Sequence, residues 1–246
     1  MPPPYGMIDL HSHVLPGIDD GARDLSEARA MLECAVADGI ALQVLTPHLH
    51  PHRYGNSPAR LRAAFTAFQT ALGDEPPRIE LRQAAEVRAS TEIVSLVERD
   101  EVPWLGEWSG ERVLLLEFPY NNLPLGSAKL VEWLRNRNIR PLIAHPERTL
   151  ELQRAPEKLQ PFIEAGCLLQ LTAGSLTGVF GAPAHRLAVA LLEQGHVTAL
   201  ASDCHNLRDR SPLLTPGVAA AASIIGTEAA RDLVTTNPGR ILDVFA

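Results

Sequence analysis

The segment MIDLHSHVLPGIDDG, residues 7–21, carries five side chains that can bind a metal ion, which are Asp9, His11, His13, Asp19 and Asp20. Side chains alternate between the two faces of a β-strand, so positions 9, 11 and 13 share one face. Two imidazoles on such a face are about 7 Å apart along the strand, and they reach one ion only if the strand end bends. Pro16-Gly17 would allow that bend. The segment therefore predicts a metal site at the end of a strand.

Further metal-binding side chains stand at the ends of other apolar runs along the chain. They are His48, Glu86, Glu117, His145, Asp203 and His205, whereas the run over 167–173 offers only Thr172. In parallel α/β barrels, the active site forms at the carboxyl ends of the strands, where several strands contribute side chains. We therefore expect these residues to share one site with His11 and His13.

The elements that would position these residues are seven strand-like runs separated by helical patterns. Several runs lack polar alternation, which is typical of strands buried on both faces in a parallel sheet. Between them we expect a helix capped by Ser26 and ended by Gly39, a helix from Ser57-Pro58 to Gly73, and a helix over 183–193. The strand-like runs cover 7–13, 41–48, 79–87, 112–118, 140–146, 167–173 and 197–205.

This alternation of strands and helices over 246 residues predicts a single α/β domain. Barrels of this class commonly contain about 200–250 residues in one domain. A glycine-rich phosphate-binding turn does not follow the first strand, which favours a barrel or barrel-like closure over an open, doubly wound sheet.

The composition restricts the partners and the compartment. The formal net charge is −7 with acidic and basic residues intermixed, which argues against a nucleic-acid-binding protein. The three cysteines show no C-x-x-C spacing and favour a reducing compartment. Neither a bilayer-spanning apolar run nor a signal-peptide pattern is present. We expect a cytoplasmic protein without membrane insertion, with residues 1–6 as a disordered leader, and the sequence leaves its oligomeric state open.

The candidate ligands are too numerous for one tetrahedral zinc ion. Imidazole and carboxylate donors without cysteine suit two or three ions of manganese, iron or zinc, with a carboxylate bridging a pair. Such a cluster lowers the pKa of bound water and supplies hydroxide at neutral pH. Arg148 in HPER and Arg210 in HNLRDR follow two of the candidate ligands, and an arginine fork suits a phosphate dianion. Hydrolysis of a phosphate monoester is the reaction that this combination predicts.

Some neighbouring polar residues have more ordinary interpretations. Asp19 and Asp20 could serve only as turn residues before the first helix. His50 and His52 lie further into their loop than His48. We therefore expect them to support the site or to face the substrate rather than to bind an ion.

The motifs DLHSH, TPH, AAEV, LLEFP, AHPER and SDCHN resemble, in order and spacing, those of the PHP (polymerase and histidinol phosphatase) superfamily. The stretches IDLHSHVLPGIDDGARDLSEA, TPHLHPHRYGN, IAHPER and ASDCHNLRDRSP are similar to the bacterial metal-dependent protein-tyrosine phosphatases of capsule and exopolysaccharide loci. The resemblance covers nearly the whole chain from Met7. It implies a distorted (β/α)7 TIM-like barrel, the PHP fold, as one metallophosphatase domain over residues 7–246.

The resemblance also implies a trinuclear site that is usually activated by manganese. Carried over residue by residue, the first ion would be held by His11, His13, Glu86 and Asp203, the second by Glu86, Glu117 and His145 with Glu86 as the bridge, and the third by Asp20, His48 and His205. Asp9 is expected to orient other groups rather than to bind an ion. Cys204 departs from the family pattern, in which a small residue such as alanine is expected.

The activity implied by the resemblance is that of a protein-tyrosine phosphatase acting on a bacterial tyrosine autokinase that controls capsule or exopolysaccharide synthesis. In the expected mechanism, hydroxide on a metal ion attacks phosphorus while Arg148 and Arg210 grip the phosphoryl group. The leaving tyrosyl oxygen would take a proton from a nearby acid, for which His48, His50 and His205 are the candidates.

Other functions also fit parts of the sequence. One alternative is a histidinol-phosphate or other small-molecule phosphatase, and another is a regulatory partner of the kinase that keeps the metals for structure. A nuclease is disfavoured because basic and aromatic residues are not interleaved. CHNLRDR, residues 204–210, spells the C-x5-R signature of cysteine-based tyrosine phosphatases, but this loop has no glycine to wrap around a phosphate. We predict that this match is a coincidence.

Overall fold

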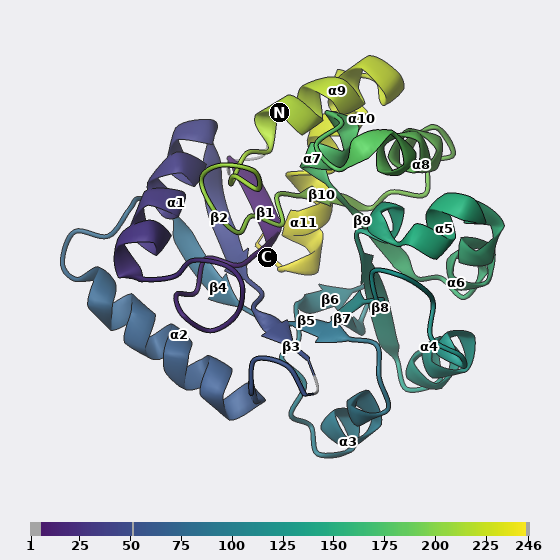
Figure 1. Ribbon diagram of the computed structural model, residues 1–246, viewed down its shortest axis with the longest axis horizontal. Coiled ribbons are helices and arrows are strands. Elements are labelled where there is room, and N and C mark those ends of the chain that lie inside the picture. The colour runs from purple at the N-terminus through teal and green to yellow at the C-terminus, as the bar shows by residue number, and fades with distance from the viewer. Residues whose placement is uncertain (1–5, 51, 245–246) are drawn as a thin grey trace.

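A computed structural model describes residues 6–50 and 52–244, so of the expected leader only Gly6 lies within the described residues. The strands gather around the centre of the molecule, and most of the helices lie outside them (Figure 1). The strands are β1 (Met7–Ser12), β2 (Ile40–Leu45), β3 (His48–Leu49), β4 (Glu80–Gln83), β5 (Glu86–Arg88), β6 (Gly106–Trp108), β7 (Glu111–Glu117), β8 (Ile139–Ala144), β9 (Leu168–Thr172) and β10 (Ala199–Ala201).

The three helices that the sequence predicts are present as the first, second and eighth α-helices of the described residues. The α-helices are α1 (Leu25–Asp38), α2 (Pro58–Leu72), α3 (Glu92–Glu98), α4 (Ser127–Arg135), α5 (Leu150–Arg154), α6 (Gln160–Glu164), α7 (Ala173–Leu176), α8 (Gly181–Glu193), α9 (Thr215–Ile225), α10 (Thr227–Asp232) and α11 (Thr236–Ile241). Two short 3-10 helices are η1 (Pro146–Arg148) and η2 (Pro156–Leu159).

The ends of the first two long helices test the capping predictions. The cap expected at Ser26 is wrong, because the side chain of Asp24 accepts the N–H of Glu27 and α1 begins at Leu25. Gly39 ends α1 in the left-handed conformation that glycine adopts at little cost. Ser57 caps α2 as predicted, by accepting the N–H of Arg60.

Each of the seven strand-like runs contains a strand, but two of the runs are interrupted. The run 41–48 divides into β2 and β3 around Pro47, which has no N–H to donate to a ladder, and the run 79–87 divides into β4 and β5. After these interruptions β3 and β5 pair with each other, with His48 in register with Glu86. The breaks therefore move two candidate ligands from one sheet to the other. The sequence reading missed the short strand β6, which pairs antiparallel with β7.

The strands form two sheets rather than one. The first has the order β1-β2-β4 and the second has the order β10-β9-β8-β7-β5-β3, and all these pairs are parallel. A parallel bridge between Ser12 and Cys204 joins the end of β1 to the segment after β10. The described residues form a single α/β unit with parallel sheets, as predicted, but no closed sheet, so the expected barrel closure is not confirmed.

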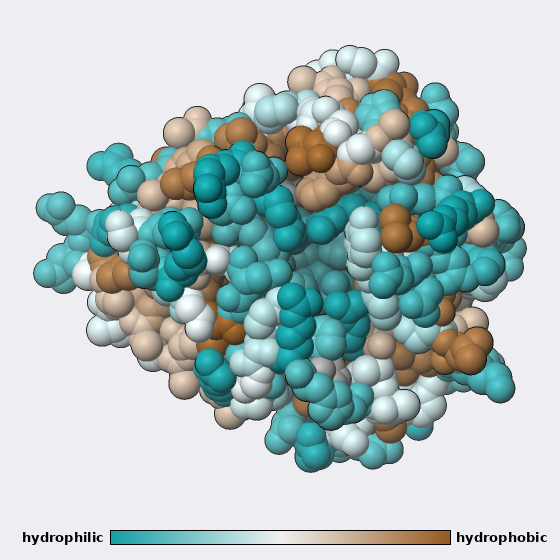
Figure 2. Space-filling view, in the orientation of Figure 1, coloured by the Kyte–Doolittle hydropathy of each residue, from teal (hydrophilic) through white to brown (hydrophobic). Residues whose placement is uncertain are grey.

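Strand burial explains why the apolar runs show no polar alternation. On β7, Val113 and Leu115 belong to one buried cluster, whereas Leu114 and Leu116 belong to another. Both faces of the strand are therefore covered, as expected for a parallel sheet with helices outside it. Among the described residues, no helix is long and apolar enough to cross a membrane. Figure 2 shows a hollow in the middle of the face viewed, and hydrophilic residues line it.

Candidate metal centre

The end of β1 brings two imidazoles into contact. His11 and His13 are fully buried, and their Nε2 atoms lie 3.1 Å apart. Nδ1 of His11 is hydrogen-bonded to Oε1 of Gln170 on β9 at 2.9 Å, and Nδ1 of His13 to Oδ2 of Asp19 at 2.8 Å. A hydrogen bond of this kind at Nδ1 fixes the ring and leaves Nε2 as the metal-binding atom. The convergence expected for this pair is present.

The loop after β1 folds back onto the strand that precedes it. Ala22 donates its N–H to the carbonyl of His13, and Gly17, with φ of +68°, donates to the carbonyl of Ala22. A side chain at Gly21 would place its Cβ 1.9 Å from the His13 carbonyl oxygen, so this close approach requires glycine. The fold-back of this loop positions Asp19 beside His13 and returns Asp20 to the cluster.

Two ligand candidates adopt left-handed backbone conformations at strand ends. Asp203, after β10, has φ of 49°, and His145, after β8, has φ of 32°. Such angles are uncommon outside glycine and often mark functional positions. The N–H of Asp203 donates to the carbonyl of His11, and its Oδ1 lies 3.4 Å from Nε2 of His11 and 3.3 Å from Nε2 of His13. The strained turn therefore aims a carboxylate at the histidine pair.

Glu86 occupies the middle of the cluster. Its Oε1 lies 2.8 Å from Nε2 of His145, and its Oε2 lies 2.7 Å from Nδ1 of His48. The same Oε2 is 3.5 Å from His11 and 3.4 Å from His13. A carboxylate with imidazoles on both oxygens is placed to bridge two ions, which is the role that the family resemblance implies for it.

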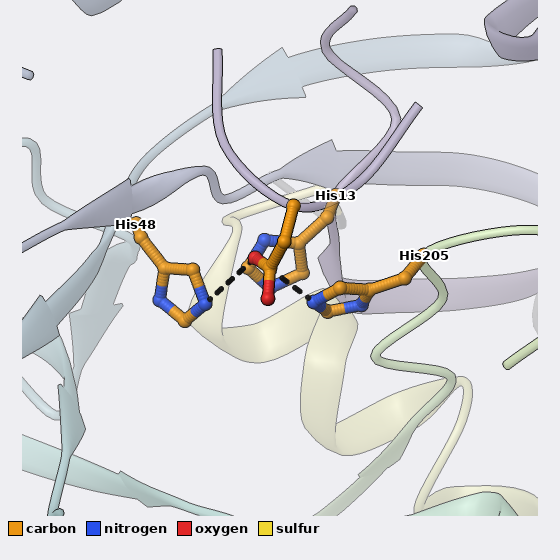
Figure 3. A group of neighbouring side chains, drawn as sticks. His13, His48 and His205 are labelled. Atoms are coloured by element: carbon orange, nitrogen blue, oxygen red, sulfur yellow. Dashed lines mark ion pairs between the residues drawn. The ribbon is translucent and has the colours of Figure 1, made fainter. Parts of the chain in front are cut away.

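Asp20 lies between two imidazoles at the outer side of the cluster. Its Oδ1 is 3.4 Å from Nε2 of His48 and 3.6 Å from Nε2 of His205. Figure 3 shows the rings of His13, His48 and His205 turned toward one another, with these two ion pairs drawn as dashed lines. The carboxylate of Asp20 is 43% exposed, whereas the other acidic candidates are buried. The side of the cluster at Asp20 is therefore the one open to solvent.

All nine predicted ligands fall into groups whose donor atoms lie within 4.8 Å of one another. The groups are His13, Asp20, His48 and His205; His11, His145 and Asp203; His11, His13 and Glu86; and His48, Glu86 and Glu117. They differ from the family assignment in three ways: His145 lies with His11 and Asp203, His48 joins Glu86 and Glu117, and His13 joins Asp20, His48 and His205. Buried imidazole and carboxylate donors at this spacing fit several divalent ions.

The five imidazoles of the cluster fall into two classes. Despite burial, the neighbouring carboxylates raise the pKa of His11, His13 and His48, the last to about 10, so ions bound by these three would displace protons. Burial, together with the positive charge of Arg148, lowers the pKa of His145 to about 4. Burial, together with His13, lowers the pKa of His205 to about 4. A neutral imidazole keeps the lone pair that a metal needs. Burial and the charge of Glu86 raise the pKa of Glu117 to about 7, and a cation between these carboxylates would offset their repulsion.

Both predicted arginines contact the same carboxylate oxygen. Nη1 of Arg148 and Nη2 of Arg210 donate to Oδ2 of Asp203, the latter at 2.6 Å. Asp203 thus directs one oxygen to the histidines and the other to the guanidinium groups. The arginines therefore lie at the edge of the cluster, where a phosphoryl group bound to the ions would meet them.

A family model for capsular polysaccharide synthesis, CpsB/CapC, matches residues 7–243. The chain belongs to this family. Tyrosine-protein phosphatase YwqE of Bacillus subtilis is 33% identical over 205 residues, which cover 83% of this chain and 80% of YwqE. Tyrosine-protein phosphatase CpsB of Streptococcus pneumoniae is 25% identical over 245 residues, which cover 96% of this chain and 98% of CpsB.

Solved structures agree with this membership. Crystal structures of YwqE from Bacillus subtilis and CpsB from Streptococcus pneumoniae, described as metal-dependent tyrosine phosphatases, include a chain that matches with a TM-score of 0.88 and 30% identity. The match covers 96% of this chain and 94% of that one. An enamidase of the amidohydrolase superfamily matches with a TM-score of 0.54 at 14% identity, which shows likeness of fold alone.

In this CpsB/CapC chain, Cys204 has none of the properties of a nucleophile. The residue is fully buried, and burial raises the pKa of its thiol to about 12. A reactive cysteine needs a lowered pKa and access to the substrate. The prediction that the C-x5-R match is coincidental agrees with both observations.

The sequence reading missed three residues that hold the CpsB/CapC site in place. The sequence presents Asp19 as a side chain able to bind a metal ion or as a turn residue, not as a partner of His13, and it predicts no role for Gln170 or for Arg88, whose Nε lies 3.2 Å from Oε2 of Glu117. A polar residue within the apolar run CLLQLTA was a usable signal for Gln170. Asp19 and Arg88 gave no comparable signal, because turns and strand ends often carry charged residues.

The remaining sequence candidates lie around the CpsB/CapC cluster rather than in it. Asp9 is buried and accepts hydrogen bonds from the N–H and hydroxyl of Ser202 and the amide of Gln43. Asp9 therefore links β1 to Gln43 on β2 and to Ser202 after β10, and its hydrogen bonds do not involve an imidazole ring. His52 is largely exposed, and its closest acidic neighbour is Glu92 at 4.0 Å.

Proposed function

We propose that this chain is a metal-dependent phosphomonoesterase, and specifically a protein-tyrosine phosphatase. The observation that carries the proposal is the position of Arg148 and Arg210 on Asp203, at the edge of a cluster of nine buried or half-buried ligands. Metal ions and guanidinium groups side by side suit the binding of a phosphoryl group. The names and metal dependence of the YwqE and CpsB relatives support the same activity.

The ligand groups support two or three divalent ions, for which we propose manganese, with iron and zinc as the alternatives. When bound, the ions supply Lewis acidity and lower the pKa of coordinated water. His11, His13, Glu86 and Asp203 would hold one ion, Glu117 and His145 would hold a second with Glu86, and Asp20, His48 and His205 would hold a third.

The protein side chains have separate roles in the proposed hydrolysis. The guanidinium groups of Arg148 and Arg210 hold the phosphoryl oxygens and orient the phosphorus for attack from the side of the cluster. The Nε2 atoms of His48 and His205 point toward Asp20. These two histidines would therefore contribute to catalysis mainly as metal ligands. Asp20, which is half-exposed, lies on the side of the cluster that is open to solvent, from which the substrate would enter.

We further propose that the substrate is a phosphotyrosyl protein, namely a bacterial tyrosine kinase of polysaccharide export, and that the reaction takes place in the cytoplasm. The CpsB/CapC family description and the tyrosine-phosphatase relatives support this assignment. We also propose that the two sheets act as one distorted (β/α)7 barrel, which the bridge between Ser12 and Cys204 supports.

The test begins with protein purified without chelators. Elemental analysis should find two or three divalent ions per chain, and a count of zero or one would contradict the metal assignment. The metal-loaded protein should hydrolyse p-nitrophenyl phosphate and a phosphotyrosyl peptide, with a higher kcat/KM for the peptide than for histidinol phosphate. A preference for histidinol phosphate would replace the protein-tyrosine phosphatase assignment, and no turnover of any of the three would favour a regulatory role.

A further inference from the structure

A small open cavity lies beside Arg210, between the segment around α7 and the loop from β10 into α9. Its volume is about 90 Å³, and the side chains lining it include Thr172, Val179, Phe180, Arg210 and Leu213. Binding sites for drug-sized molecules have volumes of about 300–1,000 Å³, so this cavity is suited to a single side chain. The mechanism proposed above does not use it.

The lining of the cavity combines the apolar side chains Val179, Phe180 and Leu213 with the hydroxyl groups of Thr172, Thr177, Ser202 and Ser211. Val179 is 55% exposed and Leu213 is 37% exposed, so both can contact a ligand that enters the cavity. Phe180 lies under the guanidinium group of Arg148, with the Cζ atom 4.3 Å from the ring centroid. In Figure 2, hydrophobic residues border the hydrophilic hollow on the side of α7 and α9. A flat apolar group such as an aromatic ring could therefore pack against Val179, Phe180 and Leu213.

The lining also includes two buried polar groups that lack hydrogen-bond partners among the described residues. Thr172 is 1% exposed, and its Oγ1 has no partner. Nε of Arg210 is also unpartnered, although Nη2 of the same side chain lies 2.6 Å from Asp203. Buried polar groups without partners cost free energy, so a ligand atom that accepts from both donors would be stabilised. Arg210 thereby connects the cavity directly to the candidate metal centre.

The charge of the lining disfavours a second phosphate. Of the described residues that line the cavity, Arg210 and Asp209 carry charge, and the two charges offset each other. The Asp209 carboxylate would repel an anionic group, whereas it would not repel an uncharged ring. The cavity thus differs from the cluster at Asp203, where cations would gather.

We propose that this cavity is the subsite for the aromatic ring of the substrate, with Phe180, Val179 and Leu213 against the ring and Thr172 and Arg210 donating to the ester oxygen. The proposal rests on the phosphatase function proposed above and makes the site selective for aryl over alkyl phosphates. In hydrolysis the bond from phosphorus to the ester oxygen breaks, and its electron pair passes to that oxygen. Water supplies the new bond to phosphorus and the proton that the tyrosyl oxygen finally takes. The two donors stabilise the charge that develops on the leaving oxygen.

The apolar walls are tested with V179S and L213S, separately and together, in the manganese-loaded protein. We measure kcat/KM for p-nitrophenyl phosphate and for phosphoserine, each relative to the unaltered protein. The double variant should lose roughly fivefold more on the aryl substrate than on the alkyl one, because only the ring contacts these walls. L125S, at a fully exposed leucine outside the cavity lining, is the matched control and should change neither value. Equal losses on both substrates would overturn the subsite.

Thr172 is tested separately through the leaving group. Phenyl phosphate has a poorer leaving group than p-nitrophenyl phosphate and depends more on stabilisation of the departing oxygen. T172V should therefore lower kcat for phenyl phosphate about tenfold and kcat for p-nitrophenyl phosphate much less, with the metal content unchanged. Equal effects on the two esters would show that Thr172 does not contact the ester oxygen.

The two proposals fail in different ways. If the metal-loaded protein hydrolyses no aryl phosphate, the proposed function is wrong and the subsite is wrong with it. If it hydrolyses aryl phosphates and none of the four variants V179S, L213S, V179S/L213S and T172V changes selectivity or leaving-group dependence, the function stands and only the subsite is wrong.

Discussion

His11 on β1 and Gln170 on β9 are joined by a hydrogen bond of 2.9 Å between the imidazole Nδ1 and the amide Oε1, although 159 positions separate them in the chain. Both side chains are fully buried. The amide oxygen accepts the Nδ1–H, which leaves Nε2, pointed at His13 and Asp203, as the ring atom available to a metal ion. Gln170, which is not an expected metal ligand, thereby orients the ring of His11, which is one.

Replacement of this amide should weaken the metal site. We expect Q170L to lower the affinity for manganese by roughly 10- to 100-fold, because His11 loses the acceptor that orients its ring. Titration calorimetry on the metal-free protein measures the change. Q69L, at an exposed position of α2, serves as the control. Equal affinities for Q170L and Q69L would mean that the hydrogen bond does not influence metal binding.

Removal of either arginine should affect turnover rather than metal content. R148A and R210A each delete a donor to the phosphoryl group, for which losses of roughly 10²-fold in kcat are typical. Neither arginine is a ligand, so elemental analysis should find the same number of ions as in the unaltered protein. Loss of ions from R148A would show that its contact with Asp203 maintains the cluster instead.

The cysteine and the metals can be distinguished by two treatments. C204S should retain at least about half of the activity, because the thiol is buried and its pKa is raised to about 12. Chelation with EDTA should abolish activity, and added manganese should restore it. An inactive C204S protein that keeps its fold and its metals, together with a chelator-resistant activity, would instead support a cysteine mechanism.

Gly21 should be intolerant of a side chain. An alanine Cβ at this position would lie 1.9 Å from the carbonyl oxygen of His13, so the loop that carries Asp19 and Asp20 must move. We expect G21A to lower the free energy of unfolding by about 2–4 kcal/mol and to weaken metal binding as well. G73A, where a Cβ meets nothing within 4 Å, is the comparison and should leave metal binding intact. Thermal unfolding with and without manganese separates the two effects.

Much of the candidate site could be read from the sequence because it depends on strand ends. His11, His48, Glu117 and Asp203 each follow or end a buried apolar run, and parallel strands bring such positions to one edge of the fold. That reasoning needs no knowledge of the distances involved. The helix cap was assigned to Ser26 instead of Asp24 because both residues are good caps, and the local pattern does not distinguish them.

The finer geometry could not be read in this way. The division of 41–48 into β2 and β3 places His48 in register with Glu86, and a continuous strand would have given a different neighbour. The partners Gln170 and Arg88 lie on strands that are remote in the chain from the residues they contact. The predicted closure of the sheets is not confirmed, since the strands of the described residues form two sheets, with a parallel bridge between Ser12 and Cys204.

By itself, the sequence indicated which side chains gather in the candidate site and on which edge of the fold they lie, because residue type and strand periodicity are local properties. Only the tertiary structure decided how they combine. It placed Glu86 between His48 and His145, gave Asp203 two arginines on one oxygen, and put Thr172 in a cavity beside them. These relationships depend on sheet pairing and on left-handed turns at His145 and Asp203, which arise from packing between segments that are distant in the chain.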